Sequence, residues 1–125
     1  MIYLAGKISG LTRYEANTWR EEVKANFNSH NPLDGMGIDG EYTPQEIVAR
    51  NKYFIDRSDV ILAEMQHKEP SPGTIGEIVY ANMKGKPVIT WGRAEYNENP
   101  WIRAHVTKHF DFLDEAIEYI KAMYL

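Results

Sequence analysis

Apolar residues follow two alternating patterns along this chain. Short continuous apolar runs at residues 2–5 and 59–65 are typical of buried strands in a parallel sheet. Between them, apolar residues recur every three or four positions; Trp19, Val23 and Phe27 predict an amphipathic helix over residues 13–28. The same two patterns alternate to the end of the chain. Further strands are expected at 87–91 and 109–110, and further helices at 44–55, 75–83 and 113–120, with a helical turn at 100–104.

Local signals mark where these elements begin and end. Thr12 or Ser9 is positioned to cap the first helix, and Glu15 stands at capping-box spacing from Thr12. Thr43 followed by Pro44 is a typical helix start. Residues 29–43 hold three glycines and a proline, which predicts a loop with at most a very short strand before it. A loop of this length in a compact domain is often functional, and it could close over a ligand.

The alternation of strands and helices predicts the fold class. It favours a single α/β domain over residues 1–125, with a mostly parallel sheet of about five strands and helices on both faces. Right-handed crossovers place the loops after the first, third and fourth strands at one edge of the sheet. We therefore expect Gly6-Lys7, residues 71–77 and Trp91-Gly92 to converge there.

Composition and charge narrow the possible partners. The net charge of −4 and a pI near 5.5 argue against a nucleic-acid polymer as ligand. The sequence has no cysteine, which excludes disulfides and thiol catalysis and is compatible with the cytoplasm. No apolar run approaches the ~18–20 residues of a membrane span, and the start of the chain reads as a strand rather than a signal peptide. The four histidines lack metal-ligand spacing, so neither a metal site nor a cofactor is expected.

The segment Ser71-Pro72-Gly73-Thr74-Ile75-Gly76-Glu77 carries the candidate chemistry. It joins a predicted strand to a predicted helix through small residues, and unpaired N–H groups at such a helix start bind anions or sugars. Glu77 lies inside the helix, where its carboxylate could face the same crevice. A carboxylate in that place indicates nucleophilic or acid–base chemistry on a bound sugar. The alternative is a solvated glutamate that interacts with the helix dipole.

At this point the chain resembles the nucleoside 2-deoxyribosyltransferase superfamily, which includes N-glycosidases of nucleoside 5′-monophosphates. The resemblance covers residues 2 to about 91. It depends on Tyr3-Leu4-Ala5-Gly6, on residues 59–64, and on residues 73–81 followed by Gly85-Lys86-Pro87-Val88-Ile89. It implies a flavodoxin-like, Rossmann-like three-layer sandwich, a homo-oligomer, and a glutamate nucleophile at Glu77 that forms a glycosyl-enzyme.

Two positions depart from the pattern of the transferases. Ser71 replaces an aspartate that holds sugar hydroxyls, and the monophosphate glycosidases also have serine there, against the 5′-phosphate. A hydroxyl suits a phosphate where a carboxylate would repel it, which favours a nucleotide substrate. Asn51 replaces an aspartate that helps to protonate the leaving base, and an amide cannot deliver a proton. Either Asn51 only orients the base, or Asp56 or another acid supplies the proton, or turnover is slow.

The remaining candidate substrate-binding residues come from the same crevice. Lys7, Gly73 and Thr74, with Gly6, are expected around the sugar and phosphate. Tyr3 is either a core residue or reaches the sheet edge with its hydroxyl. Trp91 could stack on a base or belong to the core.

The sequence leads to one functional hypothesis and two rivals. The hypothesis is an enzyme that cleaves the N-glycosidic bond of a nucleoside or its 5′-monophosphate, by hydrolysis or base transfer. One rival is an NAD-type glycohydrolase, which also uses a glutamate in a related fold. The other is a nucleotide-binding module with little or no turnover, in which Asn51 marks the lost activity.

Overall fold

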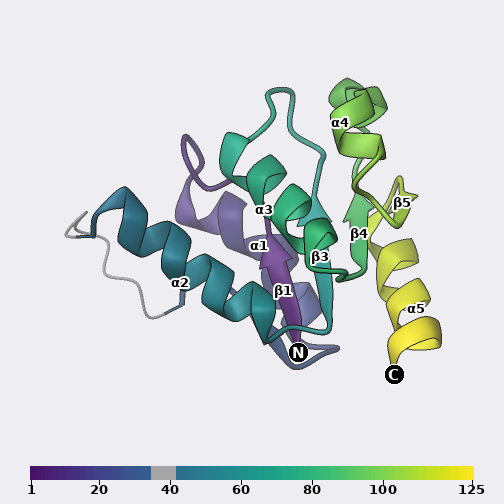
Figure 1. The fold of residues 1–125 in the computed structure, drawn as a ribbon. Helices are drawn as coiled ribbons and strands as arrows, with labels where there is room; N and C mark the ends of the chain where they lie inside the picture. Colours follow the sequence, from purple (N-terminus) through teal and green to yellow (C-terminus); the bar gives the residue numbers. More distant parts are fainter. Residues whose placement is uncertain (35–41) are drawn as a thin grey trace.

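The fold is seen in a computed structural model, which describes residues 1–34 and 42–125; residues 35–41, within the predicted loop, lie outside the described part. In the described part, five strands and five α-helices alternate along the sequence (Figure 1). The strands are β1 (Ile2–Ala5), β2 (Ser29–His30), β3 (Val60–Glu64), β4 (Val88–Trp91) and β5 (Lys108–Phe110). The helices are α1 (Arg13–Lys24), α2 (Pro44–Asp56), α3 (Pro72–Met83), α4 (Pro100–Arg103) and α5 (Leu113–Tyr124), with a 3₁₀ helix, η1 (Glu95–Glu98).

The strands form one sheet in the order β2-β1-β3-β4-β5, and every neighbouring pair is parallel. This is the flavodoxin-like order, so the expected three-layer α/β fold is confirmed, with a fully parallel sheet. The chain crosses from β1 outward to β2 and later returns to place β3 on the other side of β1. Ile2 therefore pairs with Val60, and Ala5 with Ala63. In sheets of this kind, ligands bind outside the carboxyl ends of the strands where the order reverses, here β1 and β3.

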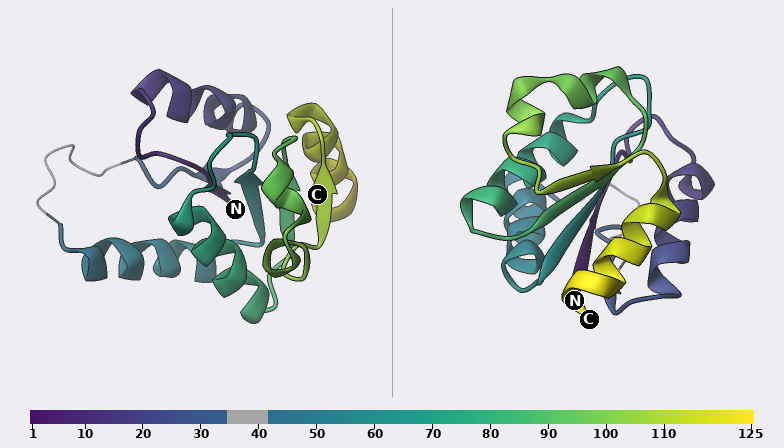
Figure 2. Two further views of the ribbon diagram at one scale, coloured as in Figure 1. Left: turned by 90° about the horizontal axis from the view of Figure 1, so that it is seen from above. Right: turned by 90° about the vertical axis from the view of Figure 1, so that its right-hand side faces the viewer.

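Helices cover both faces of the sheet, as Figure 2 shows from two further directions. Helices α1 and α5 pack on one face, where Trp19 and Ile117 join Leu4 and Leu62 in a buried cluster. Helices α2, α3 and α4 cover the other face. Because both faces of the sheet are buried, the strands read as continuous apolar runs without polar alternation.

The helix starts follow from local side-chain chemistry. Thr12 and Thr43 each form a complete capping box, with Glu15 and Glu46 respectively. Ser71 caps α3, which begins at Pro72 and so includes the small residues predicted as a turn before Ile75. Helix α1 ends at Lys24, four residues before the predicted end. Within the described residues, no helix has both the length and the apolar character needed to cross a membrane.

Candidate active site

A cavity of about 760 Å³ opens at the carboxyl ends of β1 and β3, between the loops that follow them and α2. Seven of the nine residues predicted for the site line it. These are Gly6, Lys7, Asn51, Ser71, Gly73, Thr74 and Glu77. Its remaining lining residues are Ile8, Ser9, Arg13, Pro32, Leu33, Ile47, Pro70 and Pro72. The loops after β1 and β3 therefore converge as expected.

Glu77 is the partly buried carboxylate of this cavity. It lies in the second turn of α3, and Tyr3 of β1 donates a hydrogen bond from its hydroxyl to Oε2. Burial raises the pKa of Glu77 to about 7, although the Tyr3 hydrogen bond and the positive charge of Arg20 each lower it. A carboxylate with this pKa changes between nucleophile and proton donor near neutral pH. Tyr3 is completely buried, so its hydroxyl contacts the Glu77 carboxylate from the interior of the protein.

The start of α3 forms one wall of the cavity. The Ser71 hydroxyl accepts a hydrogen bond from the N–H of Thr74 at 3.4 Å, the long limit for such a bond. The Thr74 hydroxyl is buried, and its oxygen has no hydrogen-bond partner among the described residues. At Gly73 an added Cβ would meet only Ser71 Oγ, at 3.9 Å. The N–H of Gly73, which the Ser71 cap does not use, the two hydroxyls and the small residues together suit an anionic ligand.

Two cations face this wall from the segment after β1. Lys7 and Arg13 both line the cavity. Lys7 was expected from the sequence; Arg13, in the first turn of α1, was not, because its place at a helix start carries no signal of its own. Together with the helix start, these two charges make the cavity attractive to phosphate.

Asn51 lies on α2, across the cavity from α3. Its Oδ1 is buried and has no partner in the described part of the chain. Asn51 and Glu77 also line a second, largely apolar cavity of about 410 Å³ between α2 and α3, with Ile47, Ile55 and Tyr80 among its other residues. Asp56, the alternative acid, bonds to the Tyr80 hydroxyl at 2.8 Å and lines neither cavity. The structure therefore does not bring Asp56 to the site.

Trp91 does not line either of these cavities. It is 7% exposed and packs edge-on against Trp19, within the core on the α1 and α5 side of the sheet. Of the two alternatives for Trp91, the structure shows the core position. Tyr3 combines its two alternatives, since its ring is in the core while its hydroxyl reaches Glu77.

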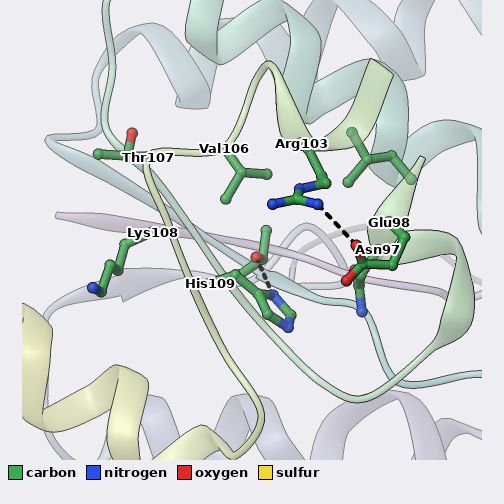
Figure 3. Close-up of a pocket in the computed structure, with 9 residues that line it drawn as sticks. Asn97, Glu98, Arg103, Val106, Thr107, Lys108 and His109 are labelled. Carbon is green, nitrogen blue, oxygen red and sulfur yellow. Dashed lines mark hydrogen bonds and ion pairs between the residues drawn. The ribbon is translucent and has the colours of Figure 1, made fainter. Parts of the chain in front are cut away.

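Another cavity, of about 350 Å³, lies beside β4, β5 and α4 (Figure 3). Figure 3 shows Arg103 paired with Glu98. His109 is hydrogen-bonded through Nδ1 to the Thr90 hydroxyl. None of the predicted site residues lines it. Its charged side chains are paired with each other or exposed, so we place the candidate active site at the carboxyl ends of β1 and β3.

The sequence did not predict the side chains that pack behind the site and hold Tyr3 and Gly6 in place. Tyr3 stacks on His30, and His30 stacks on Phe54 of α2 with ring centroids 3.6 Å apart. Arg20 of α1 is fully buried behind Gly6 and donates to its carbonyl. No local pattern identifies these contacts, since they depend on how α1 and α2 dock on the sheet.

The fold and this cavity define an α/β protein with a carboxylate of raised pKa beside a helix start that is suited to an anion. The family model described as nucleoside 2-deoxyribosyltransferase matches residues 2–113, and the chain belongs to that family. This confirms the expected family and the class of enzyme, one that cleaves N-glycosidic bonds of small nucleoside or nucleotide substrates.

Individual relatives agree with this assignment. A curated protein of Thermofilum pendens, named "Putative 2'-deoxynucleoside 5'-phosphate N-hydrolase 1", is 28% identical over 136 residues, covering 98% of this chain and 93% of the relative. Among solved structures, the 2-deoxyribosyltransferase of Bacillus psychrosaccharolyticus has a TM-score of 0.76 at 17% identity, covering 94% of this chain and 90% of its own.

Two further structures are similar in fold over nearly the whole chain. The Leishmania mexicana enzyme, also a 2-deoxyribosyltransferase, has a TM-score of 0.72 at 24% identity, covering 99% of this chain and 98% of its own. A CMP N-glycosidase of Clostridium botulinum has a TM-score of 0.61 at 18% identity with the same coverage.

Proposed function

We propose that this protein hydrolyses the N-glycosidic bond of a 2′-deoxynucleoside 5′-monophosphate, with Glu77 as the nucleophile. The observation that carries the proposal is the position of Glu77, in one cavity with the start of α3 and two cations. Its pKa of about 7 makes this carboxylate more basic than an ordinary glutamate, and a large share of the molecules still hold it as an anion at neutral pH.

The reaction proceeds in two displacements. Glu77 attacks C1′ of the sugar, the bond to the base breaks, and its electron pair leaves with the base, which takes up a proton. Water then attacks C1′, loses a proton, and releases Glu77 as a carboxylate. If a second base enters in place of water, the same site performs transfer. The Tyr3 hydrogen bond keeps Oε2 fixed, which leaves Oε1 of Glu77 as the attacking atom.

The phosphate preference depends on the wall opposite Asn51. The Ser71 hydroxyl and the N–H of Gly73 supply donors, while Lys7 and Arg13 supply positive charge. The relative from Thermofilum pendens, whose name specifies a 5′-phosphate, is consistent with this preference. A nucleoside without phosphate would leave these groups unpaired by the substrate.

Asn51 serves the leaving base in this proposal. Its buried Oδ1 lacks a partner among the described residues, so a donor on the base can supply the missing hydrogen bond. The apolar cavity that begins at Asn51 and Glu77 offers a surface for a planar ring. Because an amide cannot act as the acid, the leaving base takes its proton from water or from another group near the substrate.

The test is base release, followed by chromatography, from a panel of deoxynucleoside 5′-monophosphates and the matching nucleosides. We expect release from a monophosphate, a loss of about 10³-fold or more in Glu77→Ala, and little change in Glu69→Ala, an exposed carboxylate in the loop before α3. Ser71→Ala should raise KM for the monophosphate more than for the nucleoside. Mass spectrometry with a slow 2-fluoro sugar substrate should locate an adduct on Glu77.

Other results would lead to a different function. Full activity in Glu77→Ala, or no base release from any nucleotide, contradicts the proposal. Release of nicotinamide from NAD would identify the glycohydrolase alternative. Nucleotide binding by calorimetry without product would identify a binding module.

We also propose that residues 1–125 act as one domain in a cytoplasmic homo-oligomer. The absence of cysteine fits a reducing compartment. Trp101 and Met83 are 70% and 78% exposed, and both are large apolar side chains of the α3 and α4 side. Such residues are suited to a subunit contact, which sedimentation analysis would detect.

A further inference from the structure

The turn after β2, residues 31–34, is held from within by Asn31. Asn31 is 1% exposed; its Oδ1 accepts the N–H of Leu33 at 3.0 Å, and its carbonyl accepts the N–H of Asp34 at 2.9 Å. Bonds of this kind, from a side chain and a carbonyl to the backbone two and three residues ahead, fix a tight turn. Pro32 and Leu33, inside this turn, both line the active-site cavity.

Helix α1 holds the turn through the Asn31 side chain. Arg20 donates to Asn31 Oδ1 at 3.2 Å, and Asn31 Nδ2 donates to Oδ1 of Asn17 at 2.8 Å. The buried Arg20 also donates to the carbonyl of Gly6 at 3.1 Å, in the loop after β1. The turn is therefore joined to the loop that brings Lys7 to the same cavity.

Helix α2 holds the turn through Arg50. Its Nη1 donates to the carbonyl of Pro32 at 2.9 Å, and its Nη2 donates to the carbonyl of Asp34 at 2.6 Å. A planar guanidinium can bridge two carbonyls in this way, whereas the ammonium group of lysine is a single point charge. Arg50 stands outside the lining of both cavities as the described residues define it, so it acts on a ligand through the turn.

The turn forms the apolar end of the cavity. It follows β2, whereas the polar groups around Ser71 follow β3, and β1 separates these two strands in the sheet. Pro32 is buried and Leu33 is partly exposed, so the turn presents apolar surface to a ligand. Asn51, which serves the leaving base in the proposed function, is the next residue after Arg50 on α2. The ring of a nucleotide therefore fits this end of the cavity, and its phosphate fits the other.

We propose that the turn at residues 31–34 is the base-recognition wall of the active site, in which Leu33 packs on the base and Arg50 is the positioning residue that holds the turn in place. This inference rests on the proposed function. Because both helices already hold the turn, a base that packs on it loses little affinity to the ordering of the chain.

The experiment compares two ligands by calorimetric titration. One is a deoxynucleoside 5′-monophosphate, and the other is 2-deoxyribose 5-phosphate, which keeps the sugar and the phosphate but has no base. Both are titrated into Glu77→Gln, which lacks the proposed nucleophile, so that the nucleotide stays intact. Adding Leu33→Ala should weaken nucleotide binding by about tenfold, since an apolar contact is lost, and should leave sugar-phosphate binding unchanged. Equal effects on both ligands, or no effect on either, would overturn the inference.

Arg50→Gln and Arg50→Lys, in the same background, separate the bridge from the charge. Glutamine removes both, and lysine keeps the charge without the bridge, so each should weaken nucleotide binding by about five- to tenfold with little effect on the sugar phosphate. If Arg50 instead attracted the phosphate by its charge, Arg50→Gln would weaken both ligands and Arg50→Lys neither, which would contradict a positioning role.

Arg57 supplies the matched control. It is exposed at the end of α2 and donates to the carbonyl of Tyr53 in its own helix at 3.1 Å, so Arg57→Gln should change neither affinity. If Arg50→Gln fails to fold, Leu33→Ala alone decides, because it removes no hydrogen bond of the turn.

The titrations need no turnover. If the variants weaken only nucleotide binding while the unmodified protein releases no base, the proposed function is wrong and the base-recognition wall stands. If base is released through Glu77 while the variants bind the nucleotide normally, the proposed function stands and the base-recognition wall is wrong. A protein that binds no nucleotide would contradict both.

Discussion

The hydroxyl of Tyr3, in the first strand of the sheet, donates a hydrogen bond to Oε2 of Glu77 on α3. The two residues are 74 positions apart in the sequence, and the pairing of β1 with β3 brings them together. Burial and the neighbouring carboxylate raise the pKa of Tyr3 above its ordinary value, so the phenol stays protonated and remains a donor. The carboxylate thus has one oxygen fixed and one available to a substrate.

Tyr3→Phe should lower activity most strongly at low pH. The hydrogen bond from Tyr3 lowers the pKa of Glu77, so its loss raises that pKa and moves the acid limb of the kcat/KM profile upward. A hydrogen bond to a charged group contributes about 1.5–3 kcal/mol, which corresponds to a loss of about tenfold or more at pH 6. Steady-state kinetics between pH 5 and 9 measure this loss of activity and the shift of the acid limb. Tyr119→Phe, in α5 and outside both cavities, is the matched control. Identical profiles for Tyr3→Phe and the unmodified protein would contradict the assignment.

Glu77→Gln should make the protein more stable at neutral pH while it abolishes base release. The pKa of Glu77 is about 7 in the folded protein against an ordinary value of 4.5, so the folded state binds more protons between these values. The contribution of Glu77 to stability is therefore fully present below about pH 4.5 and is lost as the pH rises through 7. Glutamine does not ionise, so the Glu77→Gln variant does not lose this stability as the pH rises. Denaturant unfolding at pH 5 and pH 8 should show its advantage growing with pH, and a constant difference would refute the raised pKa.

Asn51→Asp should raise turnover. An aspartate at this place, beside Glu77 in the same cavity, has its pKa raised by the like charge and by burial, and so it can carry the proton that the leaving base needs. General acid catalysis commonly contributes 10²-fold or more, and we expect an increase in kcat of about tenfold at pH 6. Asn51→Leu, which keeps the size and removes the polar group, should lower kcat. A kcat in Asn51→Asp at or below that of Asn51→Leu would show that the base is protonated by another route.

Gly6→Ala and Gly76→Ala should have opposite effects on stability. The new methyl group at Gly6 would lie 2.9 Å from Trp19 and 3.0 Å from Arg20, and overpacking of this kind costs about 1–3 kcal/mol. At Gly76, inside α3, the added Cβ would meet no side chain and no other segment of the described chain within 4 Å, so alanine should stabilise the helix by about 0.5–1 kcal/mol. Thermal unfolding of both variants measures this. Equal melting temperatures would show that the space behind Gly6 is not filled as described.

Much of the fold follows from the sequence because its signals are local. Continuous apolar runs identify strands buried on both faces, and Thr12, Thr43 and Ser71 determine helix starts through their own hydroxyls. The parallel topology then brings Lys7 and Glu77 to one edge of the sheet without further information.

The position of Trp91 shows what local signals cannot decide. All four residues of β4 are buried, so no polar alternation tells which face each side chain takes. Val88 belongs to the α2 and α3 side, whereas Ile89 and Trp91 belong to the α1 and α5 side. The register of the strand, which depends on its neighbours β3 and β5, makes that choice.

The burial of Arg20 is a second feature that local sequence signals cannot predict. A charged residue on an amphipathic helix is ordinarily solvated, and the sequence pattern gives Arg20 no other reading. Its burial depends on Gly6 and Asn31, which lie 14 and 11 positions away in two different loops. Only the docking of α1 against the sheet brings these three residues together.

The place of β1 between β2 and β3 also bears on how the protein is made. During synthesis, β1 leaves the ribosome well before its partner β3, which follows only with Val60–Glu64. Until then, the emerging chain can form capped helices and the two-residue pairing with β2, but not the centre of the sheet. The nascent chain therefore exposes an apolar strand at residues 2–5 until β3 has been synthesised, and a chaperone that shields this strand would protect it during that time.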